Sequence, residues 1–313
     1  MPILSDGILY SVVRQEHLPH SDFFLRWLSF PEEPQQLTFT CLSGGRELCR
    51  VSYGSAEIAA RLAYGREELP RYRASSLRRI LGLSHCPPNA FLHEYFSLYA
   101  SQPVDSLLVE AVCGGELSQK RIRVVPYQSP NRYRFPLKGT FLVTDTYPAL
   151  NSHRWCRNSE FALDVGAFDG TLRQIRIAGA PVFAACAGAV EQAFDGLEDT
   201  TEDTDLDALE RQVGESPRID GNHVLLRHPH GELSLYAHLG KGSVAVRPGQ
   251  AVEAGQLLGR VGSSGSSWIP HLHFHVMLDG LHGPGVPVAF ENLTTILGEP
   301  CALEDTVNLV RAE

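Results

Sequence analysis

Three histidines alternate with apolar residues in one short segment of the chain, PHLHFHV, at residues 270–276. In a β-strand every second side chain points to the same face, and such neighbours lie about 6.5 Å apart along the strand. A strand at this position would project His271 and His273 together, which suits one metal ligand beside one acid or base. Taken alone, an H-x-H pattern is weak evidence, because histidines in strands are more often packed or solvated.

Short β-type runs separated by glycine surround this segment from about residue 137 onward. Examples are GTFLVTD, FALDVGA, NHVLLRHPHG and ELSLYAHL. Strands at this spacing predict a compact, mainly antiparallel β domain, which we place at residues 137–300. A polar stretch with two prolines, YQSPNRYRFP at residues 127–136, is the expected boundary to the preceding part.

The first 127 residues are expected to form an α+β region of their own. Helix-like apolar spacing occurs at residues 55–64, 75–83 and 90–100. Strand-like runs occur at residues 105–113 and 119–126, with a Gly-Gly turn between them. This region contains no recognisable chemical motif, so its role is not predicted.

The formal net charge of −9 is concentrated in one segment of the chain. Residues 195–215 contain nine acidic residues and one basic residue, Arg211, so the remainder is close to neutral. An acidic balance argues against nucleic acid as the main partner, because phosphate binding needs a basic surface. We expect a solvated surface insertion between two strands. Its D-x-D-x-D run lacks the later glycine and glutamate of an EF-hand calcium loop.

The seven cysteines are scattered and include no C-x-x-C pair, a pattern more typical of free thiols than of a disulfide framework or a cysteine zinc site. The N-terminal residues lack the basic start and long apolar run of a secretion signal. No stretch approaches the roughly 18 continuous apolar residues of a membrane helix. As written, the sequence favours a cytoplasmic protein without a transmembrane segment. Its oligomeric state is not predicted.

Further motifs accompany the histidine segment in a fixed order. SLYAHL, in which His238 ends a strand-like run, is followed by VRPGQAVEAGQLLG at residues 246–259 and GSSGSS at residues 262–267. APVFAACAGAV lies upstream at residues 180–190. As a set, these motifs resemble the lysostaphin-type (LytM-like) zinc peptidases over about residues 137–290. The resemblance implies an antiparallel β-sheet or sandwich with the lysostaphin-like peptidase fold.

The resemblance also implies a function. Members of this family hydrolyse peptide bonds, so we expect a zinc metalloendopeptidase acting on peptidoglycan cross-links or similar peptides that contain glycine or D-amino acids. Such a substrate implies a location in the cell envelope or outside the cell, whereas the N-terminal residues as written lack the features of a secretion signal.

Three residues are the expected zinc ligands. In the family, zinc is held by an H-x-x-x-D motif and by the second histidine of H-x-H, which correspond here to Asp164 and His273. Four residues before Asp164 stands Glu160 instead of histidine. A branch of the family has N-x-H some ten residues before the aspartate, and Asn151 and His153 match that arrangement. We therefore expect His153 as the third ligand, with Glu160, which can also bind zinc through oxygen, as the alternative.

The same resemblance assigns catalytic roles to His238 and His271. Between them they would orient the attacking water, stabilise the oxyanion and transfer a proton to the leaving amine. Imidazoles titrate near neutrality, which suits that work. His275 stands where the family more often has glutamate. We expect it to be packed or solvent-facing, with support of a ligand as the alternative.

Two other functions compete with an active peptidase. A catalytically inactive relative that acts as a binding or regulatory module is the main alternative, because the compact H-x-x-x-D motif is absent. The presence of His238, His271 and His273 favours activity. The PGQ…GQLLG hairpin also resembles biotinyl or lipoyl carrier domains, but it has no lysine between Arg247 and Arg260.

Overall fold

The computed structural model describes residues 3–313 except 16–18, 31, 69–89, 145–151, 168–176, 202, 206–218, 268, 282, 302 and 304–306. The chain divides into two compact units. The first comprises Met1–Gln128 with Arg154–Arg157, and the second comprises Ser129–His153 with Asn158–Glu313. The domain borders expected from the sequence remain our proposal.

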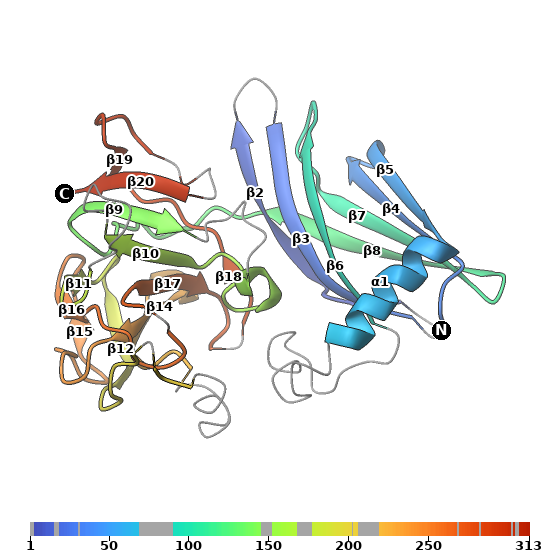
Figure 1. Ribbon diagram of the computed structural model, residues 1–313. Coiled ribbons are helices and arrows are strands. Elements are labelled where there is room, and N and C mark those ends of the chain that lie inside the picture. The colour runs from blue at the N-terminus through green and yellow to red at the C-terminus, as the bar shows by residue number, and fades with distance from the viewer. Residues whose placement is uncertain are drawn as a thin grey trace. The chain divides into compact units, whose positions relative to one another are not determined.

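The first unit is an eight-stranded sheet with one described helix beside it (Figure 1). Its strands are β1 (Leu4–Ser5), β2 (Ile8–Gln15), β3 (Pro19–Ser29), β4 (Gln36–Ser43), β5 (Arg46–Gly54), β6 (Ala90–Tyr99), β7 (Ser106–Cys113) and β8 (Glu116–Pro126). They lie in the order β1-β3-β2-β8-β7-β4-β5, and β6 also pairs with β3. Helix α1 (Ser55–Glu68) contributes Ile58 and Leu62 to an apolar cluster that includes Phe39, Leu107 and Val109 from the sheet.

The prediction of a helix at residues 90–100 is wrong. This stretch forms strand β6, which pairs antiparallel with β3 along most of its length. Apolar spacing over so short a run fits a strand as well as a helix. The run is rich in phenylalanine and tyrosine, which favour a pleated sheet surface, and the long pairing with β3 decides the outcome.

The other sequence predictions for this part fare better. The helix at residues 55–64 is confirmed as part of α1, and the strands at 105–113 and 119–126 are confirmed as β7 and β8. Gly114 and Gly115 form the predicted turn with φ angles of 56° and 83°, values that glycine adopts without strain. Residues 75–83 lie outside the described part of the chain.

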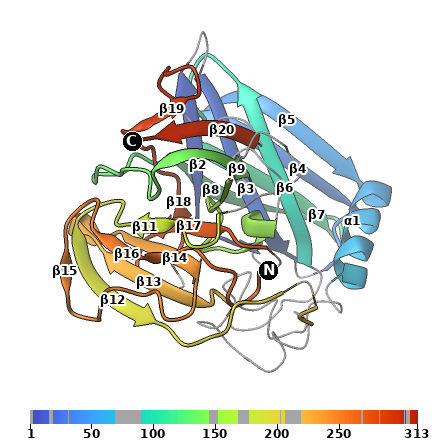
Figure 2. The same cartoon turned by 60° about the vertical axis from the view of Figure 1, so that its left-hand side comes forward.

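The second unit confirms the predicted mainly antiparallel β fold. Its strands are β9 (Gly139–Thr144), β10 (Leu163–Ala167), β11 (Pro181–Phe183), β12 (Gly188–Phe194), β13 (Asn222–Arg227), β14 (Leu233–Leu239), β15 (Ala251–Val252), β16 (Leu257–Arg260), β17 (Leu272–Met277), β18 (Gly285–Val286), β19 (Leu293–Thr295) and β20 (Val307–Ala312). The larger sheet has the order β15-β12-β13-β14-β17-β10-β9-β20-β19, with β18 paired to β17, and β11 pairs with β16 separately. Figure 2 shows β12, β13 and β14 side by side. Two short 3₁₀ helices, η1 (Ser152–Trp155) and η2 (Pro229–Gly231), lie between strands.

Strand β17 occupies the middle of this sheet, between β14 and β10. On one face Phe274 packs edge-on against Tyr236. Because side chains alternate along a strand, His273, His275 and Met277 lie on the opposite face. Met277 joins an apolar cluster made mainly by β14. The histidines of β17 are therefore held on a rigid, largely buried strand.

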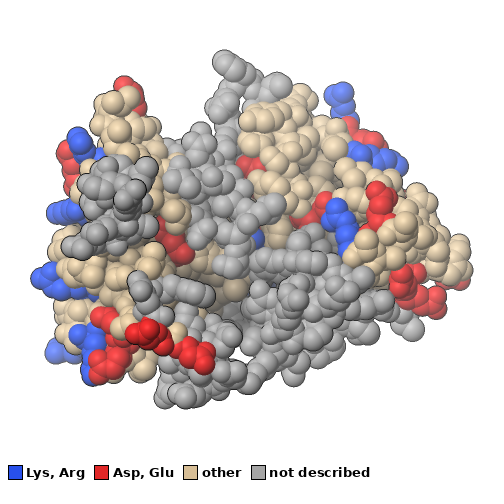
Figure 3. Space-filling view, in the orientation of Figure 1, with Lys and Arg blue, Asp and Glu red and all other residues tan. Residues whose placement is uncertain are grey.

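The acidic segment at residues 195–215 follows β12 and precedes β13, so it lies between two strands, as predicted. Figure 3 shows acidic side chains gathered along the lower edge of this unit. Asp195, Glu198 and Asp199 are exposed, as expected of a solvated insertion. They are nevertheless tied to the rest of the unit by hydrogen bonds, for example from the Gly242 amide to Asp195 Oδ1 at 2.7 Å. Among the described residues, no helix has the length and apolar character needed to cross a bilayer.

Buried His228 predicts how stability depends on pH in this unit. Its Nδ1 lies 2.9 Å from the Ala187 carbonyl oxygen and its Nε2 lies 2.6 Å from Ser234 Oγ. Burial is the main cause that lowers the pKa of His228 below its ordinary value of 6.5. The unfolded chain thus binds a proton that the folded ring does not bind, so the stabilisation is complete above pH 6.5 and is lost as pH falls below it.

We expect His228→Gln to remove this contribution. Between about pH 7 and pH 5, the free energy of unfolding should fall less steeply with pH in the variant than in the wild type. The two slopes should differ by at most roughly 1.4 kcal/mol per pH unit, the contribution of one proton. Denaturant unfolding at several pH values measures both slopes. Equal slopes in the two proteins would contradict the assignment.

Candidate metal centre

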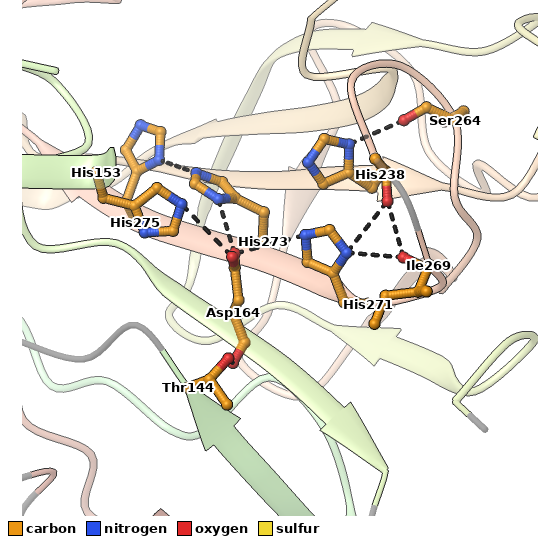
Figure 4. Close-up of polar contacts among 10 residues, drawn as sticks. Thr144, His153, Asp164, His238, Ser264, Ile269, His271, His273 and His275 are labelled. Atoms are coloured by element: carbon orange, nitrogen blue, oxygen red, sulfur yellow. Dashed lines mark hydrogen bonds and ion pairs between the residues drawn. The ribbon is translucent and has the colours of Figure 1, made fainter. Parts of the chain in front are cut away.

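The structure brings together all five site residues predicted from the sequence (Figure 4). His153 comes from η1 and Asp164 from β10, while His238 lies near the end of β14. His273 is in β17, and His271 immediately precedes that strand. Residues from four distant stretches of the chain therefore meet at one place, at the centre of the larger sheet.

Strand pairing explains why Asp164 and His273 are in contact. The two residues are directly opposite each other in the antiparallel pair β10–β17. Opposite residues point to the same face, and His273 Nδ1 lies 3.0 Å from Asp164 Oδ1. On the other side of β17, Ala237 of β14 is opposite His273. Regular alternation would turn the next residue, His238, to the other face, but its φ of 59° departs from strand geometry, and its ring lies 5.8 Å from the His273 ring between centroids.

His153, Asp164 and His273 form a group able to hold a metal ion. The three donor atoms lie within 4.8 Å of one another. His153 Nε2 is 3.5 Å from Asp164 Oδ2, and the rings of His153 and His273 are 4.8 Å apart between centroids. Two imidazole nitrogens and one carboxylate oxygen are the donor set of many open catalytic zinc sites, so these residues fit such an ion. The alternative ligand, Glu160, is buried and is not a member of this group.

The charge on Asp164 fits the same use. Burial alone would raise the pKa of this carboxyl group, but the imidazoles of His153, His273 and His271 outweigh that effect and hold the pKa well below its usual range. Asp164 is therefore ionised at any physiological pH. A carboxylate already free of its proton is ready to coordinate a cation.

His238 and His271 lie next to this group, with ring centroids 4.7 Å apart. His238 Nδ1 is 2.8 Å from the Ser264 carbonyl oxygen, and His271 Nδ1 is 2.9 Å from the Ile269 carbonyl oxygen. A carbonyl oxygen can only accept, so both rings carry their proton on Nδ1 and donate it. The Nε2 atoms of both rings are not engaged by these carbonyl groups, and His271 Nε2 is 3.5 Å from Asp164 Oδ1.

His238 is held in an unusual state by its surroundings. Burial, followed by the charges of His271 and His273, lowers the pKa of His238 well below its ordinary value, so the ring is neutral at neutral pH. Its backbone φ of 59° lies in the left-handed region, which costs a residue with a Cβ roughly 1–2 kcal/mol. Such strain is typical of functional positions and persists only where the neighbouring structure enforces it.

For His275 the sequence favoured a packed or solvent-facing residue and offered support of a ligand as the alternative. His275 is packed, at 2% exposed, and its Nδ1 also lies 2.9 Å from His273 Nε2, the contact that the alternative requires. If Nδ1 of His273 binds a metal, its Nε2 carries the proton and donates it to His275. His275 then fixes the tautomer of a ligand. Strand alternation, which puts residues 273 and 275 on one face, was the signal that pointed to this contact.

The role of His275 can be tested by changing its acceptor atom. His275→Gln keeps an oxygen that can accept from His273, whereas His275→Leu has none. We expect metal affinity to fall about 10- to 100-fold in the leucine variant and much less in the glutamine variant. Competition with a chelator measures the affinities, and circular dichroism checks the fold. Equal affinities in the two variants would exclude the tautomer argument.

The fold and the donor set define a mainly β protein with a candidate metal centre. Residues 173–283 match the model of peptidase family M23. The chain thus contains a peptidase M23 (LytM-like) domain, the class of metallopeptidase that its motifs indicated. This match includes His238, His271 and His273, while His153 and Asp164 precede it.

Several proteins are similar to parts of the chain. Outer membrane antigenic lipoprotein B of Histophilus somni is 31% identical over 150 residues, 46% of this chain and 38% of that protein. The DD-carboxypeptidase/endopeptidase Mpg of Neisseria meningitidis serogroup B is 45% identical over 60 residues, 19% of this chain and 13% of Mpg. The murein hydrolase activator NlpD of Salmonella dublin is 29% identical over 137 residues, 44% of this chain and 31% of NlpD.

The chain spans well under half the length of these relatives. Among solved structures, the catalytic domain of lysostaphin from Staphylococcus simulans is 23% identical, with a TM-score of 0.28 over 48% of this chain and 83% of that domain.

Proposed function

We propose that the protein is a zinc-dependent endopeptidase that hydrolyses peptide bonds in peptidoglycan. The observation that carries the proposal is the group of His153, Asp164 and His273, whose donor atoms lie within 4.8 Å of one another beside two further imidazoles. The M23 domain supports the reaction class. The substrate is proposed from the family resemblance and from the name of a relative in Vibrio cholerae, the peptidoglycan DD-endopeptidase ShyC.

A bound zinc ion would polarise the scissile carbonyl group and lower the pKa of an attacking water. The protein side chains do the rest of the work. Because His238 is neutral and donates Nδ1–H to Ser264, its Nε2 can only accept a proton. We therefore assign His238 to orient the water by accepting a hydrogen bond from it.

His271 complements this role. With its Nδ1–H donated to Ile269, a second proton on Nε2 makes the ring cationic and able to donate. Its Nε2 lies 3.5 Å from Asp164 Oδ1, so a proton there is adjacent to the metal group. We assign His271 to stabilise the developing oxyanion and to deliver a proton to the leaving amine.

We place the protein in the cell envelope. Peptidoglycan lies there, and one relative is named as an outer membrane lipoprotein. The overall acidity of the chain gives no support for a nucleic-acid partner.

A second candidate function is activation of another hydrolase. This function is favoured by the similarity to NlpD, which is named as a murein hydrolase activator and aligns with 44% of this chain. A complete donor set, with two oriented imidazoles beside it, argues for hydrolysis by the chain itself. The two functions predict different results for the purified protein: a peptidase hydrolyses peptidoglycan alone, whereas an activator needs a second hydrolase.

Metal analysis tests the ligand assignment. We expect about one zinc ion per chain in the wild type, because the described residues contain one group of three donors suited to such an ion. His153→Ala should lose most of the metal, since it removes one of the three donors. Glu160→Gln, a matched control four residues before Asp164, should keep it. Metal loss in the glutamine variant with retention in the alanine variant would reverse the assignment.

Hydrolysis is tested on purified peptidoglycan, with soluble fragments identified by mass spectrometry. The zinc-loaded wild type should release peptide fragments, and His271→Gln should reduce the rate about 10²–10⁴-fold while keeping its zinc. A zinc-loaded wild type that releases nothing alone, yet accelerates a second hydrolase, would establish activation instead.

A further inference from the structure

The loop at residues 262–267, which we call the serine loop, contacts both proposed catalytic histidines. The Ser264 carbonyl accepts from His238 Nδ1 at 2.8 Å. Ser267 Oγ donates to the Ile269 carbonyl at 2.8 Å and lies 3.2 Å from His271 Nδ1, so the one Nδ1–H of His271 is shared between the Ile269 carbonyl oxygen and Ser267 Oγ. The direction in which each Nε2 points therefore depends on where the serine loop lies.

The start of the acidic segment holds this loop in place. Residues 195–201, which we call the support segment, follow β12 and run beside the serine loop. Asp199 Oδ1 accepts from the Ser263 amide at 2.9 Å. Thr200 Oγ1 lies 2.6 Å from the Ser263 carbonyl oxygen and 2.5 Å from the Ser267 carbonyl oxygen, so its single hydroxyl proton is shared between acceptors at the two ends of the loop. Ser263 Oγ donates in return to the Thr200 carbonyl at 2.9 Å.

The support segment is itself anchored to the end of β14 through Asn222. This side chain is fully buried, and its Oδ1 accepts from the Gly196 and Leu197 amides at 2.9 Å each. Its Nδ2 donates to the Leu197 carbonyl at 2.9 Å and to the Leu239 carbonyl at 3.0 Å. Leu239 directly follows His238. One amide group therefore fixes the support segment relative to the backbone of a proposed catalytic residue.

Close backbone packing leaves the serine loop little freedom. A Cβ on Gly262 would lie 2.4 Å from Gly240 Cα and 2.5 Å from Asp199 Oδ1. Gly265, at a φ of 80°, has no more room, since its Cβ would lie 2.4 Å from the Gly221 amide nitrogen. Contacts below 3.0 Å do not occur between real atoms of this kind, so only glycine permits this approach.

We propose that the support segment positions His238 and His271 through the serine loop, with Asp199, Thr200 and Asn222 as positioning residues. The inference rests on the proposed catalytic roles of the two histidines. His238 has a left-handed backbone that its neighbours must enforce. Hydrogen bonds from a second, separately anchored piece of chain supply that constraint. The first residues of the acidic segment, 195–201, thus support the site, although the composition of the whole segment is that of a solvated insertion.

Thr200→Val is the central test, because it keeps the shape of threonine and removes the hydroxyl proton that the Ser263 and Ser267 carbonyl oxygens share. We expect kcat on peptidoglycan to fall about tenfold, with KM and zinc content close to those of the wild type, because small misplacements of reacting groups are costly. Thr200→Ser keeps the hydroxyl and should restore the wild-type rate. Thr204→Val makes the same change at a half-buried threonine whose side-chain hydrogen bonds go to Thr201 and not to the serine loop, and should leave the rate unchanged.

A second measurement does not depend on activity. Nitrogen-15 spectra of the histidine rings report the tautomer, and spectra of His238→Gln and His271→Gln assign the two signals. Thr200→Val should shift or broaden both Nδ1–H signals, and Thr200→Ser should not. If the wild type hydrolyses nothing, the proposed function fails, while the spectra still decide whether the support segment orients the rings.

Two results would overturn the proposal. One is a folded Thr200→Val protein with unchanged ring signals and unchanged kcat. The other is a Thr200→Ser protein as impaired as Thr200→Val. If the valine variant does not fold, Asp199→Ala takes its place with Asp199→Asn as its control, since asparagine keeps an oxygen for the Ser263 amide. Equal ring signals in those two variants would also exclude the proposal.

Discussion

The contact between Asp164 and His273 is the constraint on which the site depends. The two residues lie opposite each other on neighbouring antiparallel strands, and their side chains meet at 3.0 Å. A slip of one residue in this pairing would turn one of the two side chains to the other face of the sheet. The apolar residues that alternate with them, such as Phe274, are buried on that other face, so the core fixes the register. The hydrophobic core of the second unit thereby determines which polar groups meet.

Around this pair, backbone groups set the chemistry of the imidazoles. The carbonyl oxygens of Ser264 and Ile269 place a proton on Nδ1 of His238 and His271. Each ring then directs its Nε2 atom away from that anchor. Because a carbonyl cannot reverse its role from acceptor to donor, this choice of tautomer is stable. Side-chain identity supplies the ionisable groups, and main-chain geometry determines how they are used.

The sequence predicted the β fold of the second unit because strands and glycine turns follow local rules. It predicted Asp164 and His273 through a family resemblance, and strand register explains their contact. The choice of His153 over Glu160 also needed the resemblance, since nothing local shows which side chain folds over the site. The helix predicted at 90–100 was wrong because pairing with a distant strand outweighed local spacing. The role of Thr200 was not predictable, because its partners are carbonyl groups more than sixty residues away.

The strained backbone of His238 bears on whether the domain hydrolyses its target or only binds a partner. A left-handed conformation at a residue with a Cβ costs roughly 1–2 kcal/mol and persists only where its surroundings enforce it. It is useful where a ring nitrogen must point at one position, beside a metal group and a second imidazole 4.7 Å away. Several hydrogen bonds from separate parts of the chain maintain this conformation and the ring orientation that follows from it. The fixed orientation of the His238 ring beside the metal group therefore fits the role that we propose for this residue.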